Sequence, residues 1–299
     1  MAQANGSTAV ALLELPATPR QAAFQGAYVA VVGDAGSIFV NPAGLAPIRR
    51  VSFGMSYERN PLGTALSTAA VALRVGRLDL GIGVMYLDLG GDSVIVPDPA
   101  FGGDRGIATG EIISAYDALA VGAIAYRRGM ISLGGSVKYL QESIGGGPAT
   151  SSSGVTGDVG GAIALFDIMA IGFSLQNVAG SLSSGGGGAP TKLPRTARVG
   201  MTLNIVDPQG SPRLMTTAEW IGPPGGDSYW AFGLEGGVVS SGVGLLGRAG
   251  MSAGRAPSDR RPYSLGAAIV VRNLRFEYAW QGFDALGVGA HRFGIRWER

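Results

Sequence analysis

The sequence contains few of the residues that carry out catalysis or bind metals. Among its 299 residues there is no cysteine and a single histidine, His291. The lack of cysteine excludes thiol nucleophiles, disulfides and Cys-ligated metals, and one histidine cannot build a multi-histidine metal site. Without a second histidine or a recognisable triad, we interpret His291 as structural. The residues therefore favour a protein that is not an enzyme and has no metal or cofactor.

One glycine motif matches a dinucleotide-binding fingerprint, at Gly242, Gly244 and Gly247. The fingerprint works only where a strand ends and a helix begins, because the helix N-terminus receives the phosphates. Here strand-like alternation continues through Met251, and with 51 glycines in the chain such a match is expected by chance. We therefore predict no nucleotide site.

Charged residues in the second half of the chain are the other group with potential chemistry. They are Arg198, Glu219, Glu235, Arg248, Arg275, Glu277, Arg292 and Arg296. Their segments alternate in polarity, so these side chains share one interior face if the segments are strands. Buried charges need partners. We interpret the group as a structural ion-pair network, in preference to a substrate site.

The composition narrows the class of protein. The chain is 46% hydrophobic and only 15% charged, with a mean hydropathy of +0.26. No apolar run approaches the roughly 18–20 residues that a membrane-spanning helix needs. Two options remain, an oversized soluble core or a β-barrel in which every second residue is apolar. A net charge of +2 gives little support for nucleic-acid binding, which needs a clustered basic face.

After residue 50 the chain alternates repeatedly between apolar and small or polar residues, which predicts strands. In one such segment Leu133 and Val137 fall on the apolar face and Gly134 on the other. Small residues on the polar face suit a crowded lumen better than a water-exposed sheet. We predict an all-β fold, a transmembrane antiparallel β-barrel of about fourteen strands over residues 49–299. Arginine at Leu133 should therefore be costly, and serine at Gly134 should matter much less.

Short turns and long loops alternate along the predicted barrel. Longer loops are expected at 89–110, 143–154 and 178–194, and short turns fall between the other strand ends, including Asp167 and Asp207–Gly210. In outer-membrane barrels the short turns are periplasmic. Residues 1–48 lack strand periodicity and start at that rim, so we predict that they fold into the barrel as a short helical plug.

The plug contains one sharp local feature, Asn41-Pro42-Ala43-Gly44. Pro42 has no N–H and a fixed φ, so it cannot continue a ladder or a helix interior, and the Asn41 side chain can cap or turn the chain. We interpret these residues, together with Asp34, as an elbow where the plug meets the barrel wall; an ordinary Asn-Pro turn is the alternative. Because an unpaired buried carboxylate is costly, Asp34 or Asn41 should contact the inner wall.

Three stretches resemble a known family. They are Arg20–Ala46 (RQAAFQGAYVAVVGDAGSIFVNPAGLA), Phe173–Gly180 (FSLQNVAG) and Phe276–Trp297. The first resembles the N-terminal signature of the PorV/PorQ family of outer-membrane proteins, relatives of the FadL-type hydrophobic-compound channels. The other two resemble a mid-barrel strand end and the closing strands of that family. One departure is that Glu298-Arg299 follow the last aromatic residue, Trp297.

The resemblance implies a bacterial outer-membrane protein whose barrel is closed by an N-terminal hatch. PorV-type members bind or shuttle partner proteins of type IX secretion, which is the role we expect first. The alternatives are a FadL-like transporter of hydrophobic small molecules and a structural barrel subunit of an envelope assembly. The expected partners are outer-membrane lipid, proteins of a secretion or envelope complex and a hydrophobic small-molecule ligand; nucleic acid is not expected.

Overall fold

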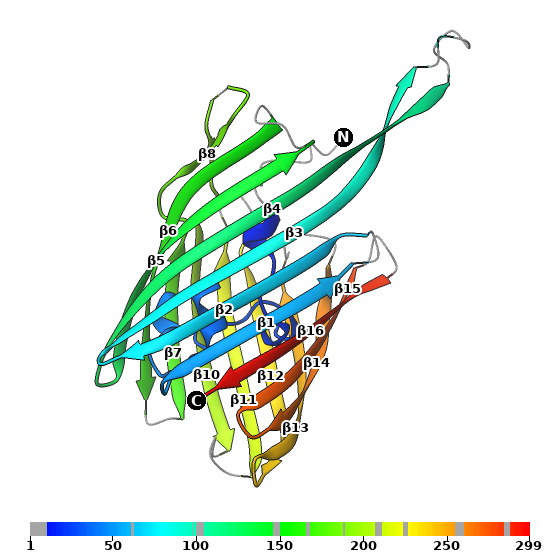
Figure 1. Ribbon diagram of the computed structural model, residues 1–299. Helices are drawn as coiled ribbons and strands as arrows, with labels where there is room; N and C mark the ends of the chain where they lie inside the picture. Colours follow the sequence, from blue (N-terminus) through cyan, green and yellow to red (C-terminus); the bar gives the residue numbers. More distant parts are fainter. Residues whose placement is uncertain are drawn as a thin grey trace.

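The computed structural model of the chain is a closed antiparallel β-barrel with a short N-terminal helix (Figure 1). The structure describes all residues except 1–10, 61–62, 98, 100–104, 146–149, 166–167, 188, 207–210, 224–226, 255–259 and 284–287. Within these described residues, fourteen strands form the barrel. No helix in the same part of the chain is both long and apolar enough to cross a membrane.

The N-terminal residues form four short helical turns before the first strand. These are η1 (Ala11–Glu14), α1 (Pro19–Ala23), η2 (Ala35–Phe39) and η3 (Pro42–Leu45). The barrel strands are β1 (Val51–Arg59), β2 (Ala65–Val75), β3 (Leu78–Pro97), β4 (Gly106–Arg128), β5 (Ile131–Ile144), β6 (Ser151–Leu165), β7 (Met169–Gln176), β10 (Thr196–Val206), β11 (Pro212–Gly222), β12 (Tyr229–Ser240), β13 (Val243–Ala253), β14 (Arg260–Val271), β15 (Leu274–Phe283) and β16 (Val288–Glu298). Two short strands, β8 (Ser181–Ser184) and β9 (Thr191–Lys192), extend the sheet beside β6.

The first and last strands close the barrel. β1 pairs with β16 from Ser52 opposite Glu298 to Arg59 opposite His291, and the other barrel neighbours follow chain order, with β7 beside β10. Because every strand is paired on both sides, the barrel has no open edge. We call the end with the short turns, such as those after β2, β4 and β14, the turn rim, and the opposite end the loop rim.

Three predicted loops are partly wrong. The expected loop 89–110 is mostly strand, because β3 and β4 continue pairing to Pro97 opposite Gly106 and form a hairpin that reaches beyond the barrel (Figure 1). Residues 151–154 belong to β6, and the loop 178–194 contains β8 and β9. Backbone pairing with a neighbour extends these strands where side-chain alternation is weak. The predicted turns at Asp167 and Asp207–Gly210 lie outside the described residues.

The alternation of the sequence separates an apolar outer face from a polar inner one. Met55, Ile82, Leu133 and Leu265 are among the many large apolar side chains exposed on the outside of the barrel. Their strand neighbours point inward and are buried or half-buried, as the two-residue period of a strand requires. The outside of the barrel is therefore apolar, as the sequence predicts.

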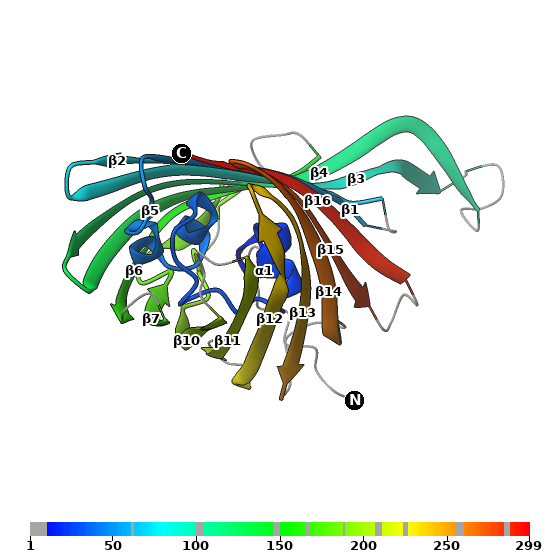
Figure 2. The same cartoon turned by 90° about the horizontal axis from the view of Figure 1, so that it is seen from below.

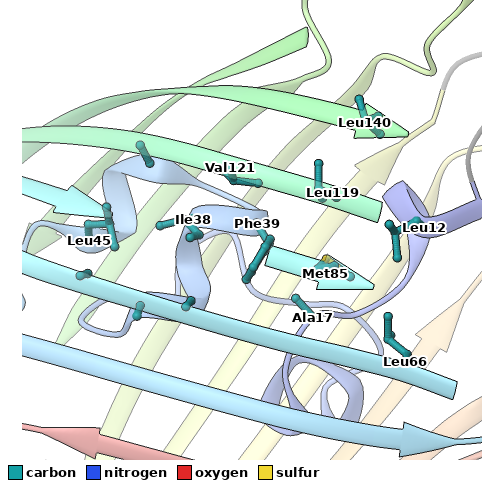
Figure 3. Packing of buried hydrophobic residues seen from close by; sticks show 14 of the residues in the cluster. Leu12, Ala17, Ile38, Phe39, Leu45, Leu66, Met85, Leu119, Val121 and Leu140 are labelled. Carbon is teal, nitrogen blue, oxygen red and sulfur yellow. The ribbon is translucent and has the colours of Figure 1, made fainter. Parts of the chain in front are cut away.

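The residues from Leu12 to Ile48, which we call the N-terminal segment, lie inside the ring of strands (Figure 2). Ile38, Phe39 and Leu45 of this segment pack with wall residues such as Met85 and Leu119 in one apolar cluster (Figure 3). A second cluster joins the part of the segment around Phe24–Val31 to β11 and β12, with Met215, Ile221 and Ala231. The core of the molecule is thus the interface between segment and wall.

Lumen-facing glycines allow the N-terminal segment to approach the wall. A Cβ at Gly134 would lie 2.5 Å from the amide nitrogen of Ala43, and a Cβ at Gly172 or Gly250 would meet the backbone of Val29 or Ala23. The close approach argues against the expectation that Gly134→Ser matters much less than Leu133→Arg. The face of Gly134 was assigned correctly, but the segment's backbone fills the space that a side chain would need.

Candidate functional site

The interior of the barrel is the candidate site, and α1 places the first polar group there. The Thr18 hydroxyl accepts a hydrogen bond from the Gln21 amide at 3.1 Å, and Pro19 occupies the first turn, so the start of α1 is capped. The helix ends where Gln25 and Gly26 adopt positive φ values of 53° and 90°. This capped turn directs the Arg20 side chain toward β12.

Hydrogen bonds of Asn41 attach the predicted elbow to the wall. Its amide Nδ2 donates to the Val29 carbonyl at 2.7 Å and to the Gly161 carbonyl of β6 at 3.2 Å. Its Oδ1 accepts from the Ala43 amide at 3.1 Å and so caps η3, which Pro42 begins. The Gly44 carbonyl accepts from the Gly33 amide at 2.8 Å. These contacts hold Asn41–Gly44 against β5 and β6.

Asp34 lies on another side of the lumen, so the structure does not bring all five elbow residues together. Its carboxylate is 2.8 Å from the Arg296 guanidinium of β16 and also accepts a hydrogen bond from the Tyr28 hydroxyl. Asp34 and Asn41 therefore contact different parts of the inner wall, and each does so through a buried polar bond.

A chain of buried ion pairs crosses this side of the lumen and is anchored in the N-terminal segment at both ends. It runs from Arg20 through Glu235, Arg248, Glu277 and Arg296 to Asp34, with N···O distances of 2.8, 2.6, 2.7, 3.3 and 2.8 Å. Each charge has at least one opposite neighbour, which offsets part of the cost of burying it. Four of the predicted charged residues lie together in this chain.

Arg292 and Arg275, two of the other four predicted members, lie apart from this chain. Arg292 pairs with Glu58 of β1 at 2.7 Å and donates to the Pro16 carbonyl, so it holds the start of the segment. Arg275 lies 3.4 Å from Glu298, near the turn rim, and reaches the chain only through that carboxylate.

Arg20 and Tyr28, which complete these contacts, were not predicted. Both lie within Arg20–Ala46, where a lone arginine in a run of small residues is the available signal. Burial would lower the pKa of Arg20, but the neighbouring Glu235, Tyr28 and Asp34 together outweigh it and hold that pKa above its ordinary value. Burial, aided by the neighbouring Asp34, raises the pKa of Tyr28, so its hydroxyl remains a hydrogen-bond donor.

Glu219 of β11 forms a further anchor for the segment. This fully buried carboxylate accepts hydrogen bonds from the amides of Tyr28 at 2.5 Å and Val29 at 2.7 Å. It also pairs with Arg198 at 2.8 Å, and Arg198 donates to the Gly26 carbonyl at 3.2 Å. One ion pair of the wall thus binds three backbone groups of the segment.

Two large cavities lie between the N-terminal segment and the turn rim. The first, of about 690 Å³, has a largely apolar wall that includes Val31, Met130, Ala164 and Met169. The second, of about 650 Å³, is lined by Arg49, Arg213, Arg272, Arg275 and Arg299. We call them the apolar cavity and the basic cavity. No cluster of metal-binding side chains occurs among the described residues.

Comparisons with known proteins agree with the barrel architecture. No protein-family model matches the chain, and no curated protein resembles it in sequence. The toluene transporter TodX of Pseudomonas putida superposes with a TM-score of 0.63 at 10% identity, over 93% of this chain and 96% of that one. The toluene transporter TbuX of Ralstonia pickettii gives 0.62 at 13% identity, over 94% and 98%. A FadL homologue of Pseudomonas aeruginosa gives 0.58 at 14% identity, over 94% and 98%.

At such low identity these similarities show a common fold. The structural neighbours are FadL-type channels for hydrophobic compounds, the group to which the PorV/PorQ family is related. They are transporters and channels, not enzymes. The PorV/PorQ resemblance and a role in type IX secretion find no support among them and stay predictions.

Proposed function

We propose that this protein is an outer-membrane channel for hydrophobic small molecules and that its N-terminal segment closes the lumen. The observation that carries the proposal is the position of the segment. It fills the ring of strands without adding a strand to it, and buried ion pairs and hydrogen bonds hold it to the wall. A separate element of this kind can shift within a barrel that stays closed.

The outer surface supports insertion into a membrane. Large apolar side chains such as Ile82, Leu133 and Leu265 are exposed over several strands, whereas soluble proteins rarely expose such a continuous patch. Exposing this apolar surface to water would cost free energy, and contact with the lipid of a membrane avoids that cost. Since short turns are periplasmic in barrels of this kind, the turn rim and both large cavities face the periplasm, and the β3–β4 hairpin faces outward.

The apolar cavity supports a hydrophobic cargo. Val31 and Ala46 of the segment form part of its wall, and β5, β6 and β7 supply Met130, Ala164 and Met169. The FadL-type fold supports the same reading, because the similar structures include toluene transporters and a monoaromatic hydrocarbon channel. The observations favour this transporter over a secretion partner or a structural subunit.

Dye uptake by whole cells tests the proposal. The full chain, expressed in a bacterial outer membrane, should raise the rate at which a hydrophobic fluorescent dye enters above that of cells with an empty vector. Deletion of residues 1–48 should leave an assembled, heat-modifiable barrel that also admits a small hydrophilic sugar in a liposome-swelling assay. Unchanged dye uptake would contradict the channel, and a truncated barrel as impermeable to sugar as the full chain would show that the segment is not its plug.

A further inference from the structure

The basic cavity at the turn rim contains more positive charge than the described side chains around it neutralise. Of its five arginines, Arg275 is paired with Glu298 at 3.4 Å, and Glu298 also lies 3.5 Å from Arg296. Glu298 is the only acidic side chain among the described residues that line the cavity. Within that part of the chain Arg49, Arg213 and Arg272 form no ion pair, and Nε of Arg213 is buried without a hydrogen-bond partner.

Guanidinium groups without partners are costly where they face one another across a concave surface. They repel each other, and the half-buried Arg213 also loses part of its hydration, whereas Arg49 and Arg272 are exposed. An anion that accepts forked hydrogen bonds from several of them removes both costs, and a phosphate group has the geometry and charge to do so. The basic cavity is therefore an anion-binding site by its chemistry.

The apolar cavity lies directly beside the basic one. Gly33, Pro47 and Arg49 line both of them. A third cavity of about 200 Å³ also has Gly33 in its wall and combines Arg213 from the basic side with Met215 from the apolar side. The loop around Gly33 thus separates an apolar compartment from a basic one, and a single ligand can reach both.

We propose that the two cavities together bind an amphiphile whose head carries two negative charges, a phosphate monoester joined to an apolar body. A monocarboxylate brings one charge for three unpaired guanidinium groups, whereas a phosphate monoester brings about 1.5 to 2 at neutral pH. The apolar body lies against Met130, Ala164 and Met169. This proposal rests on the proposed function and extends it, because it names the class of compound that the channel binds at the turn rim.

Native mass spectrometry of the full chain in a neutral detergent tests the site without any transport step. The probe is dioctanoyl phosphatidic acid, in competition with dioctanoylglycerol, dodecanoate and inorganic phosphate. Phosphatidic acid should bind at least about tenfold more tightly than each competitor. Equal binding of inorganic phosphate would show a free-anion site, and equal binding of dodecanoate would show that one charge suffices; either result overturns the proposal.

Matched variants locate the bound lipid. Arg213→Gln with Arg272→Gln should weaken phosphatidic acid binding by about tenfold or more, as expected for lost charge-assisted hydrogen bonds. Arg77→Gln with Arg128→Gln, on turns of the same rim but outside both cavities, should leave binding unchanged. An equal loss in both pairs would identify ordinary headgroup contacts around the barrel and overturn the internal site.

A substitution in the apolar cavity tests whether the apolar body of the ligand binds there, separately from its phosphate group. Ala164→Phe narrows that compartment, so it should weaken phosphatidic acid binding and leave the weak binding of inorganic phosphate unchanged. Heat-modifiable migration checks that every variant is folded, and Arg213→Lys with Arg272→Lys should restore part of the affinity. Phosphatidic acid binding without dye uptake would contradict the channel alone, and dye uptake without that binding would contradict only this inference.

Discussion

Replacing Gly134 by alanine tests whether the N-terminal segment lies where the structure places it. Gly134 is on the lumen face of β5, opposite η3. A Cβ there would lie 2.5 Å from the amide nitrogen of Ala43 and 2.6 Å from the carbonyl carbon of Pro42. Both atoms are backbone atoms, and the capping bonds of Asn41 hold that backbone to β6. The added methyl group therefore cannot be accommodated by rotating a side chain.

The expected cost of Gly134→Ala is about 1–3 kcal/mol of unfolding free energy, the usual range for overpacking an interior. The neighbouring Gly135 supplies the matched control. It faces outward, and a Cβ there meets nothing closer than the Asp158 carbonyl oxygen at 3.7 Å. Gly135→Ala should be neutral or slightly stabilising, because alanine restricts the unfolded chain more than glycine does.

The cause is isolated by repeating both substitutions in a chain that lacks residues 1–48. Without the segment the Gly134 methyl group meets no backbone, so its cost should fall to that of the Gly135 control. Guanidinium unfolding in detergent, followed by tryptophan fluorescence, measures the unfolding free energies of the six chains. The difference between the costs of Gly134→Ala in the two backgrounds is the coupling between Gly134 and the segment. If Gly134→Ala costs the same in both backgrounds, the segment does not press on β5 and the packing argument fails.

Three further predictions follow from the wall and its anchors. Leu133→Arg, on the exposed apolar face, should cost about 2–4 kcal/mol near the bilayer midplane, measured by unfolding in lipid; a cost no larger than for Leu133→Ala would contradict the assigned face. Glu219→Ala leaves Arg198 and two backbone amides without their buried partner, so it should cost about 3–5 kcal/mol, and full stability would show that water replaces the carboxylate. Because burial and Asp34 raise the pKa of Tyr28, the folded chain binds the phenol proton more tightly than the unfolded chain, and its contribution to stability is present below about pH 10 and lost above it. Tyr28→Phe should reduce the alkaline loss of stability, and an unchanged pH profile would exclude this role.

Much of the wall could be predicted from the sequence, because side-chain alternation is a local property of a strand. The expected segment 195–206 differs by one residue from β10 (Thr196–Val206), and the outward face of Leu133 is the one the pattern indicates. The prediction failed at residues 89–110, where β3 and β4 extend beyond the barrel. There the strands are formed by hydrogen bonds between β3 and β4, and the length of this pairing cannot be predicted from the side chains of one segment.

The contacts within the lumen were decided by the tertiary structure. The types of residue could be predicted: charges on the inner face need partners, and Asp34 and Asn41 are polar groups in an otherwise small and apolar segment. Which of these groups meet could not be predicted from the sequence, because Asp34 and Arg296 are 262 residues apart and Arg20 and Glu235 are 215 residues apart. Their pairing depends on closure of the barrel and on the path of the N-terminal segment through it, which together bring distant charges into one volume that is too poor in water to leave them unpaired.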